Sequence, residues 1–211
     1  MTTVATEIIK IDPDSPEPDL IGRAAAVART GAPIIFPTDT VYGIGIAALP
    51  GNLPDALYEA KQRNLDKAIP WLVADADALD VYAHDVPEYA RMMAKRHWPG
   101  ALTLIVKASK RVAGEFRADD GSIALRAPAS QITLELIREL GVPLVTTSAN
   151  MQGQPPAISV ETLDDELAKQ VKLVIDGGEC TEKVASTIVS CLGDEPIIIR
   201  QGAITEEGLW G

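Results

Sequence analysis

Short apolar runs alternate with amphipathic segments along almost the whole chain. Apolar runs bounded by Gly, Pro or Asp predict buried strands, and apolar residues spaced three or four apart predict helices. The pattern predicts strands at 33–36, 69–74, 101–107, 122–126, 142–147, 172–175, 187–189 and 196–200. It predicts helices at 20–30, 53–62, 87–97, 130–140 and near 160–170. We therefore expect an α/β or α+β protein in which helices cover one layer of sheet, with a strand order that the pattern leaves open.

The length of 211 residues fits a single domain, since domains usually contain about 100–200 residues. We expect an N-terminal extension at 1–18 and one domain at 19–211. No apolar run approaches the roughly 20 residues that cross a bilayer, and the N-terminus lacks the basic and apolar segments of a signal peptide. Cys180 and Cys191 do not form a C-x-x-C pair, which favours reduced thiols. These features predict a cytoplasmic protein without a membrane contact.

The charge of the chain is unevenly distributed. The net charge of −11 argues against a protein that coats nucleic acid through general electrostatics. Residues 61–126, however, contain 11 Lys and Arg against 9 Asp and Glu, a net charge of +2, and the remainder carries −13. Scattered charge of this kind usually lies on solvated faces. The alternative is a cationic concavity in an acidic shell, which would suit a small polyanion such as a nucleotide.

The segment GIGIAA at 43–48 matches the glycine pattern of dinucleotide-binding folds. That pattern requires a tight turn leading directly from a strand into a helix. Here the glycines come six residues after the apolar strand, and Pro50 and Pro54 prevent a continuous helix. A phosphate-binding loop of the G-x-x-x-x-G-K-[ST] type is absent from the sequence as well, so a bound phosphate would depend largely on side chains.

Ser148 could in principle be the nucleophile of a hydrolase. Such chemistry needs a histidine within hydrogen-bond reach, and the chain contains only His84 and His97. The G-x-S-x-G motif is absent. The sequence therefore does not favour a hydrolase.

Four polar segments follow predicted strands or helices, and together they suggest a binding site. They are PTDTVYGIG (37–45), KQRNLDK (61–67), GSIALRAP (121–128) and LVTTSANMQGQPP (144–156). In an extended chain, Thr38, Thr40 and Tyr42 share one face. Lys61 and Arg63, two residues apart, can converge on one phosphate group. Each segment alone could be an ordinary polar turn, but their combination favours a site for a phosphate-bearing ligand.

These segments, together with HWPGALTLIV, STIV and IIIRQGAI, resemble the YrdC-domain family, which contains the threonylcarbamoyl-adenylate synthases. The resemblance runs in order from about residue 20 to 205. It implies a twisted mixed sheet with flanking helices around a concave, positively charged cavity. It also implies a nucleotidyltransferase that joins L-threonine, bicarbonate and ATP into L-threonylcarbamoyladenylate and pyrophosphate. Other tRNA-modification proteins would use the product to modify adenosine 37 of tRNA, and Mg²⁺ would bridge the phosphates.

The resemblance further assigns roles to individual residues. The residues that bind the nucleotide and take part in catalysis would be Lys61, Arg63, Ser148 and Asn150. Further contacts with ATP would come from Lys67, Ser122, Pro156 and Arg200. The threonine side would consist of Thr40, Arg126, Thr146 and Ser186. Arg126 would bind the amino-acid carboxylate bidentately, the backbone near Thr146 would accept the ammonium group, and no protein side chain is expected to ligate a metal.

Three positions depart from the family pattern. Asn64 stands where relatives usually have proline, Leu72 where many synthases have histidine, and Ser190 where aspartate commonly follows STIV. Leu72 removes a hydrogen-bond donor from the amino-acid side, which affects the threonine assignment more than the ATP assignment. Two alternatives therefore stay open. One is a YciO-like paralogue that binds nucleotide with a different substrate, and the other is a protein that binds double-stranded RNA or tRNA.

Overall fold

The computed structural model describes residues 6–61 and 69–210. The strands in this part of the chain are β1 (Glu7–Lys10), β2 (Ile34–Phe36), β3 (Gly43–Ala47), β4 (Trp71–Leu72), β5 (Leu102–Lys107), β6 (Ser122–Arg126), β7 (Leu144–Ser148), β8 (Leu173–Asp176), β9 (Thr187–Ser190) and β10 (Ile197–Arg200). The helices are α1 (Pro18–Arg29), α2 (Asp55–Lys61), α3 (Ala78–Tyr82), α4 (Glu88–His97), α5 (Gln131–Leu140), α6 (Asp165–Ala168) and α7 (Glu206–Trp210). Short 3₁₀ helices lie at Gly114–Phe116 and Val160–Thr162.

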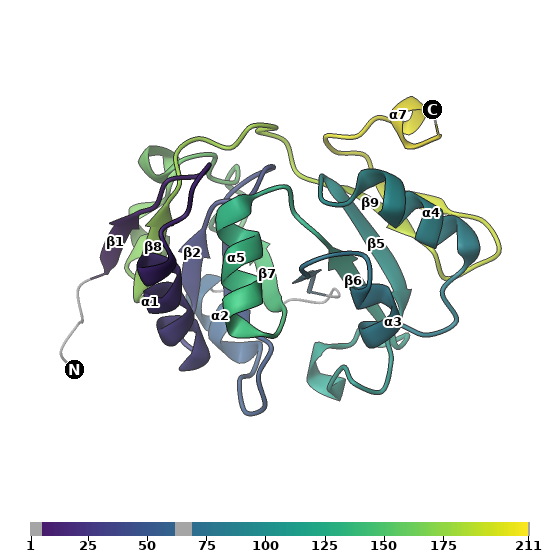
Figure 1. The fold of residues 1–211 in the computed structure, drawn as a ribbon, viewed down its shortest axis with the longest axis horizontal. Coiled ribbons are helices and arrows are strands. Elements are labelled where there is room, and N and C mark those ends of the chain that lie inside the picture. The colour runs from purple at the N-terminus through teal and green to yellow at the C-terminus, as the bar shows by residue number, and fades with distance from the viewer. Residues whose placement is uncertain (1–5, 62–68, 211) are drawn as a thin grey trace.

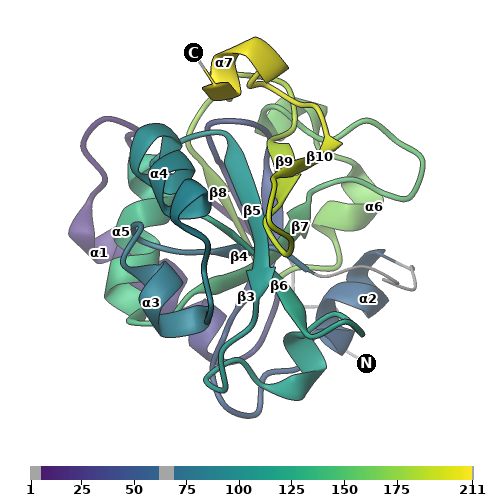
Figure 2. The same cartoon turned by 90° about the vertical axis from the view of Figure 1, so that its right-hand side faces the viewer.

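The described strands form one mixed sheet in the order β1-β8-β2-β3-β7-β4-β6-β5-β9-β10. Its centre is the two-residue strand β4, which pairs antiparallel with β7 and parallel with β6. The sheet therefore consists of two broad halves joined by a narrow bridge. Figure 1 shows β1, β8 and β2 toward one end of the molecule and β5 and β9 toward the other, and Figure 2 views the molecule from the end that carries β5 and β9. This architecture confirms the predicted twisted mixed sheet with flanking helices.

Helices α1 and α5 pack against each other on one face of the sheet (Figure 1). Both helices bury a stripe of apolar side chains against strands β1, β2 and β8, among them Ile21 and Ala25 of α1 and Leu136 of α5. A second apolar cluster lies against the other face and includes Leu57 of α2 and Met93 of α4. Burial of these stripes stabilises the helices more than intrinsic propensity does. No helix in the described part of the chain has the length and apolarity needed to span a membrane.

Local signals correctly predicted the ends of α5. The Ser130 side chain accepts a hydrogen bond from the Thr133 amide at the N-terminus, and Gly141 adopts a left-handed φ of 71° at the C-terminus. Helix α1 begins at Pro18 with Glu17 as its cap residue, and the Asn52 side-chain amide donates to the carbonyl of Ala47 at 3.0 Å. Asn52 therefore stabilises the end of β3 and does not cap a helix.

The glycine pattern at 43–48 belongs to strand β3 and does not form a nucleotide-binding turn. Gly45 pairs with Thr146 of β7, and a Cβ atom at Gly45 would lie 2.7 Å from the Thr146 hydroxyl and 2.8 Å from the Val145 carbonyl oxygen. Glycine is required here because β7 approaches the backbone of β3 closely.

Three segments differ from the expectation based on periodicity. Residues 7–10, within the stretch expected as an N-terminal extension, form the edge strand β1 and pair in parallel with β8. The strand expected at 69–74 is reduced to β4, because Pro70 has no N–H for the ladder. The helix expected near 160–170 is divided into the 3₁₀ turn and α6, which begins at a new cap, Asp164.

Candidate functional site

A cavity of about 310 Å³ lies where the two halves of the sheet meet at β7, β4 and β6. It is bordered by the segment after β2, the end of β6, the end of β7 and the segment that leads into β9. The described lining residues are Thr38, Thr40, Val41, Tyr42, Gly43, Ile69, Pro70, Leu72, Thr103, Arg126, Thr146, Thr147, Ser148, Ala185, Ser186, Ile188 and Arg200. Six residues that the sequence assigned to ligand binding therefore share one cavity: Thr40, Arg126, Thr146, Ser148, Ser186 and Arg200.

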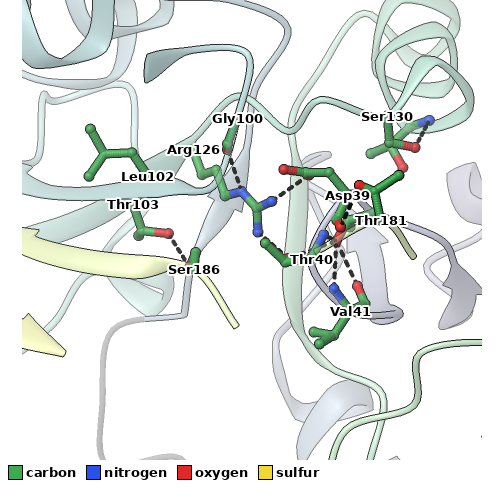
Figure 3. Close-up of polar contacts among 12 residues, drawn as sticks. Asp39, Thr40, Val41, Gly100, Leu102, Thr103, Arg126, Ser130, Thr181 and Ser186 are labelled. Carbon is green, nitrogen blue, oxygen red and sulfur yellow. Dashed lines mark hydrogen bonds and ion pairs between the residues drawn. The ribbon is translucent and has the colours of Figure 1, made fainter. Parts of the chain in front are cut away.

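Arg126 stands at the end of β6 and is held by three partners (Figure 3). Its Nε donates to the carbonyl oxygen of Gly100 at 2.9 Å, and its Nη1 donates to the Thr40 hydroxyl at 2.7 Å. Its Nη2 donates to a carboxylate oxygen of Asp39 and forms an ion pair with it. Both side chains are nearly inaccessible, with exposed fractions of 7% for Arg126 and 5% for Asp39. The guanidinium is therefore fixed in orientation before any ligand binds.

The segment 37–42 leaves β2 as a hydroxyl-rich turn. The Thr38 hydroxyl donates to the Val41 carbonyl oxygen at 2.6 Å and lies 3.0 Å from the Thr40 hydroxyl. The expected side-by-side arrangement of these hydroxyls is therefore present. Tyr42 also lines the cavity, but its phenol donates to the Gly178 carbonyl at 2.7 Å and accepts from the Gly177 amide at 3.2 Å. The phenol thus anchors the 177–178 turn.

Ser186 and Arg200 form a second polar group in the cavity lining. Ser186 lies 2.8 Å, hydroxyl to hydroxyl, from Thr103 of β5. The Arg200 guanidinium donates to the Ser186 carbonyl oxygen at 3.1 Å from Nε and 2.7 Å from Nη2. Arg200 forms no ion pair with any residue in the described part of the chain, in contrast to Arg126.

Lys61, the last residue of α2, contacts the end of β7 and the residues that follow it. Its ammonium group donates to the Ser148 carbonyl at 2.6 Å, to Asn150 Oδ1 at 3.2 Å and to the Thr147 hydroxyl at 3.3 Å. The Ser148 hydroxyl in turn donates to Asn150 Oδ1 at 2.5 Å. Lys61, Ser148 and Asn150 were grouped by the sequence, and the structure brings them into direct contact.

Four other expected residues are placed differently. Ser122 lies at the far end of β6 from Arg126, about 13 Å away along the strand, and does not line the cavity. Pro156 belongs to the loop after β7 and is also absent from the lining. Arg63 and Lys67 lie outside the described residues, as does Asn64.

The location of positive charge corrects one interpretation of the sequence. Of the cations in the +2 segment that the structure describes, only Arg126 lines the cavity, whereas Arg91 pairs with Asp80 at the surface and Lys107 with Asp85. The second cation of the lining, Arg200, comes from outside that segment. The scattered cations of 61–126 therefore lie mainly on solvated faces. The two arginines are the formally charged side chains among the described lining residues, so the lining itself is cationic.

Burial changes the protonation behaviour of several groups near the cavity. Burial lowers the pKa of the Arg126 guanidinium, Asp39 opposes this effect, and the charge of Arg200 lowers that pKa further. Burial also lowers the pKa of Arg200. It raises the pKa of the Tyr42 phenol, so this group stays neutral. A guanidinium keeps its charge despite such shifts, because its usual pKa exceeds about 12.

Two residues of this site were missed by sequence reasoning, Asp39 and Thr103. Asp39 is the one acidic residue in the hydroxyl-rich segment PTDTVYGIG, which could have marked it as a partner for a cation. Thr103 carries no comparable signal, because it alternates within the apolar strand LTLIVK as any β-branched strand residue does.

Comparisons with known proteins agree with this geometry. The sequence profile of the Sua5/YciO/YrdC family, described as telomere recombination, matches residues 26–202. Threonylcarbamoyl-AMP synthase of Bacillus subtilis is 37% identical over 89% of this chain, and that of Pyrococcus abyssi is 36% identical over 87%. The chain spans about half the length of these two relatives, 54% of each.

Solved structures show the same relationship. The crystal structure of Pyrococcus abyssi Sua5 complexed with L-threonine superposes with a TM-score of 0.90 and 35% identity, and covers 96% of this chain and 59% of that one. The crystal structure of Escherichia coli YciO superposes with a TM-score of 0.85 and 28% identity. The match covers 94% of this chain and 96% of the YciO chain. With a matching profile over most of its length, the chain belongs to the Sua5/YciO/YrdC family.

Proposed function

We propose that this protein is a nucleotidyltransferase that condenses L-threonine, bicarbonate and ATP into L-threonylcarbamoyladenylate and pyrophosphate. The observation that carries the proposal is the arrangement of one cavity. It presents a fixed guanidinium, Arg126, beside Thr40, and a second guanidinium, Arg200, that is hydrogen-bonded to Ser186. Such a cavity can bind a carboxylate and a phosphate chain together. The names of the Bacillus subtilis and Pyrococcus abyssi relatives support the same reaction.

The proposed chemistry needs positioning more than covalent catalysis. The amine of threonine attacks bicarbonate and releases water, which forms a carbamate. A carbamate oxygen then attacks the α-phosphorus of ATP, and pyrophosphate leaves with the electrons of the broken P–O bond. Rates of such transfers depend on aligning the reactants and on neutralising charge in the transition state. Hydroxyls and guanidinium groups of the cavity can provide both.

We assign the carboxylate of threonine to Arg126 and Thr40, with Thr146 and Ser186 on the same side. The phosphates are assigned to Arg200 and Ser148. Lys61 and Asn150 would position Ser148, since both bond to it directly. Roles of Arg63 and Lys67 in binding ATP stay predictions, as do those of Ser122 and Pro156, which lie outside the cavity lining.

We expect Mg²⁺ to bind to this protein together with ATP. In the described part of the chain, no group of three or more His, Cys, Asp or Glu side chains is placed to hold a metal ion. The ion would therefore bind mainly through phosphate oxygens and water, as Mg²⁺ commonly does at nucleotide sites. It would neutralise negative charge on the phosphates. Transfer of the product to other tRNA-modification proteins, direct contact with tRNA and a cytoplasmic location also stay predictions.

A YciO-like reaction with another substrate is the second candidate. Leu72 supports it, because this apolar side chain lines the cavity and pairs in register with Arg126, at the expected amino-acid side. Similarity extends over 96% of the Escherichia coli YciO sequence, compared with 54% of the longer synthases.

Pyrophosphate release from ATP distinguishes the two candidates. Purified protein would be incubated with ATP and Mg²⁺, with L-threonine and bicarbonate each present or omitted. Release that requires both compounds, with threonylcarbamoyladenylate detected by mass spectrometry, supports the synthase. Pyrophosphate release that is independent of threonine would contradict it and favour the YciO-like candidate. L-Valine, which replaces the hydroxyl of threonine by a methyl group, is the matched control for recognition of that hydroxyl.

A further inference from the structure

The two arginines of the cavity differ in one respect that decides which anion each can bind. Arg126 forms an ion pair with a buried carboxylate, Asp39. Arg200 donates to uncharged oxygen atoms of Ser186 and has no ion pair in the described part of the chain. Among the described residues, the cavity therefore contains one guanidinium that is paired with a carboxylate and one that is not.

Asp39 restricts both the orientation and the charge of Arg126. The guanidinium uses three of its five N–H groups for Gly100, Thr40 and Asp39, so two remain for a ligand. The Asp39 carboxylate contacts Nη2 of the same guanidinium. A ligand that approaches Arg126 meets a nearby negative charge as well as a positive one, and low local polarity makes both effects strong.

These features favour a zwitterion over a simple polyanion. The carboxylate of an α-amino acid can use the free N–H groups of Arg126, while its ammonium group gains from the negative charge of Asp39. A terminal phosphate group carries about 1.5–2 negative charges near neutral pH, and Asp39 repels it. Placing like charges together is a common means of rejecting a wrong ligand.

We propose that Asp39 is a positioning and specificity residue that balances the charge of Arg126, so that this subsite rejects phosphate and stays open to an amino acid. The proposal rests on the proposed function, because it assumes that amino acid and ATP occupy the same cavity. Without Asp39, the polyphosphate of ATP or the released pyrophosphate would compete for Arg126. Arg200, whose charge is unbalanced, then becomes the natural phosphate partner.

Competition between inorganic phosphate and L-threonine tests the role of Asp39. Binding of L-threonine would be measured by calorimetry at increasing phosphate concentration for the wild type and for Asp39→Asn. Asparagine keeps the shape and an acceptor oxygen for Arg126 but removes the charge. The matched control is Asp80→Asn, which makes the same change in an exposed ion pair with Arg91.

In the wild type and in Asp80→Asn, phosphate should leave the affinity for L-threonine within about twofold. In Asp39→Asn, phosphate should compete with L-threonine and should bind at least about tenfold more tightly than it binds to the wild type. This factor corresponds to one hydrogen bond to a charged group. Equal competition in all three proteins would overturn the proposal. So would a loss of L-threonine binding in Asp39→Asn without a gain in phosphate binding, since that result indicates a purely structural role.

Two further readouts keep the test decisive. If Asp39→Asn does not fold, the wild-type titration still decides, because phosphate that displaces L-threonine from the wild type contradicts charge balance. If the wild type does not bind L-threonine at all, the proposed function fails. The phosphate titration then tests Asp39 alone. An additional phosphate site in Asp39→Asn that the wild type lacks supports the charge balance, and an unchanged phosphate stoichiometry refutes it.

Discussion

The ammonium group of Lys61 donates to the carbonyl oxygen of Ser148 at 2.6 Å, which joins the last residue of α2 to the last residue of β7. Lys61 is only 1% exposed, although it is a lysine. A buried ammonium group is tolerated when several acceptors surround it, and here Asn150 and Thr147 supply two more. The contact therefore stabilises the fold and also determines where the Ser148 hydroxyl stands.

Replacement of Lys61 by methionine should reduce both stability and activity. Methionine fills a similar volume but removes the three hydrogen bonds of the ammonium group, to the Ser148 carbonyl, to Asn150 Oδ1 and to the Thr147 hydroxyl. We expect this to cost about 1–3 kcal/mol of the free energy of unfolding. Urea unfolding would measure this loss, and pyrophosphate release would measure activity. The control is Lys95→Met on the exposed side of α4. Equal stability of the two variants would show that the buried ammonium group contributes nothing.

Removal of the Ser148 hydroxyl should weaken ATP binding and leave the fold intact. The side chain is only partly buried, and within the described part of the chain its hydroxyl has one partner, Asn150. Ser148→Ala should therefore raise the dissociation constant of ATP about tenfold, which corresponds to the loss of one hydrogen bond to a charged group. Equilibrium binding measures this effect, with the exposed Ser15→Ala as control. Normal ATP affinity in Ser148→Ala would exclude this residue from the site.

Gly45→Ala should destabilise the sheet beside the cavity. The added Cβ would lie 2.8 Å from the carbonyl oxygen of Val145, a backbone atom that cannot rotate away. We expect a loss of about 1–3 kcal/mol in urea unfolding, typical of overpacking. Gly114→Ala is the matched control, since a Cβ atom at Gly114 would meet no atom within 4 Å. A loss no larger than that of the control would mean that β7 can move away from β3.

Alkaline pH should destabilise the protein through its buried thiols. Burial raises the pKa of Cys191 from its usual 9.0 to about 12. Between these values the unfolded thiol loses its proton while the folded thiol keeps it. The free energy of unfolding therefore falls as pH rises above about 9, by at most about 1.4 kcal/mol per pH unit for one thiol. Below pH 9 both states are protonated, and the thiol causes no pH dependence.

Urea unfolding of the wild type and of Cys191→Ala between pH 8 and 11 measures this effect. Alanine has no proton to lose, so the variant should show a smaller decrease of stability above pH 9. Its lower stability at pH 8, caused by the lost sulfur atom, does not affect the slope. Parallel slopes for both proteins would be inconsistent with a raised pKa of Cys191.

Helix α5 illustrates what local sequence predicts well. Its apolar stripe, the Ser130 cap and the terminal Gly141 act over neighbouring residues, so the predicted range 130–140 nearly coincides with Gln131–Leu140. Strand β4 shows where prediction from the local sequence fails. Its apolar run suggested six residues, but Pro70 and the neighbours β6 and β7 restrict pairing to two. Apolar periodicity predicts which side chains are buried. It does not predict over how many residues a neighbouring strand pairs with them.

The sequence by itself determined the fold class, the family resemblance and most of the cavity lining, because hydroxyls and Arg126 at strand ends are local features. Tertiary structure alone decided which charges meet. Asp39 and Arg126 are 87 residues apart and belong to different halves of the sheet, and Arg200 lies on β10 in the same half as Arg126. Coulomb interactions depend on distance in space, and only the folding of both halves around β4 sets that distance. For this reason the sequence indicated a cation for a carboxylate ligand, while the fold revealed that a protein carboxylate already balances it.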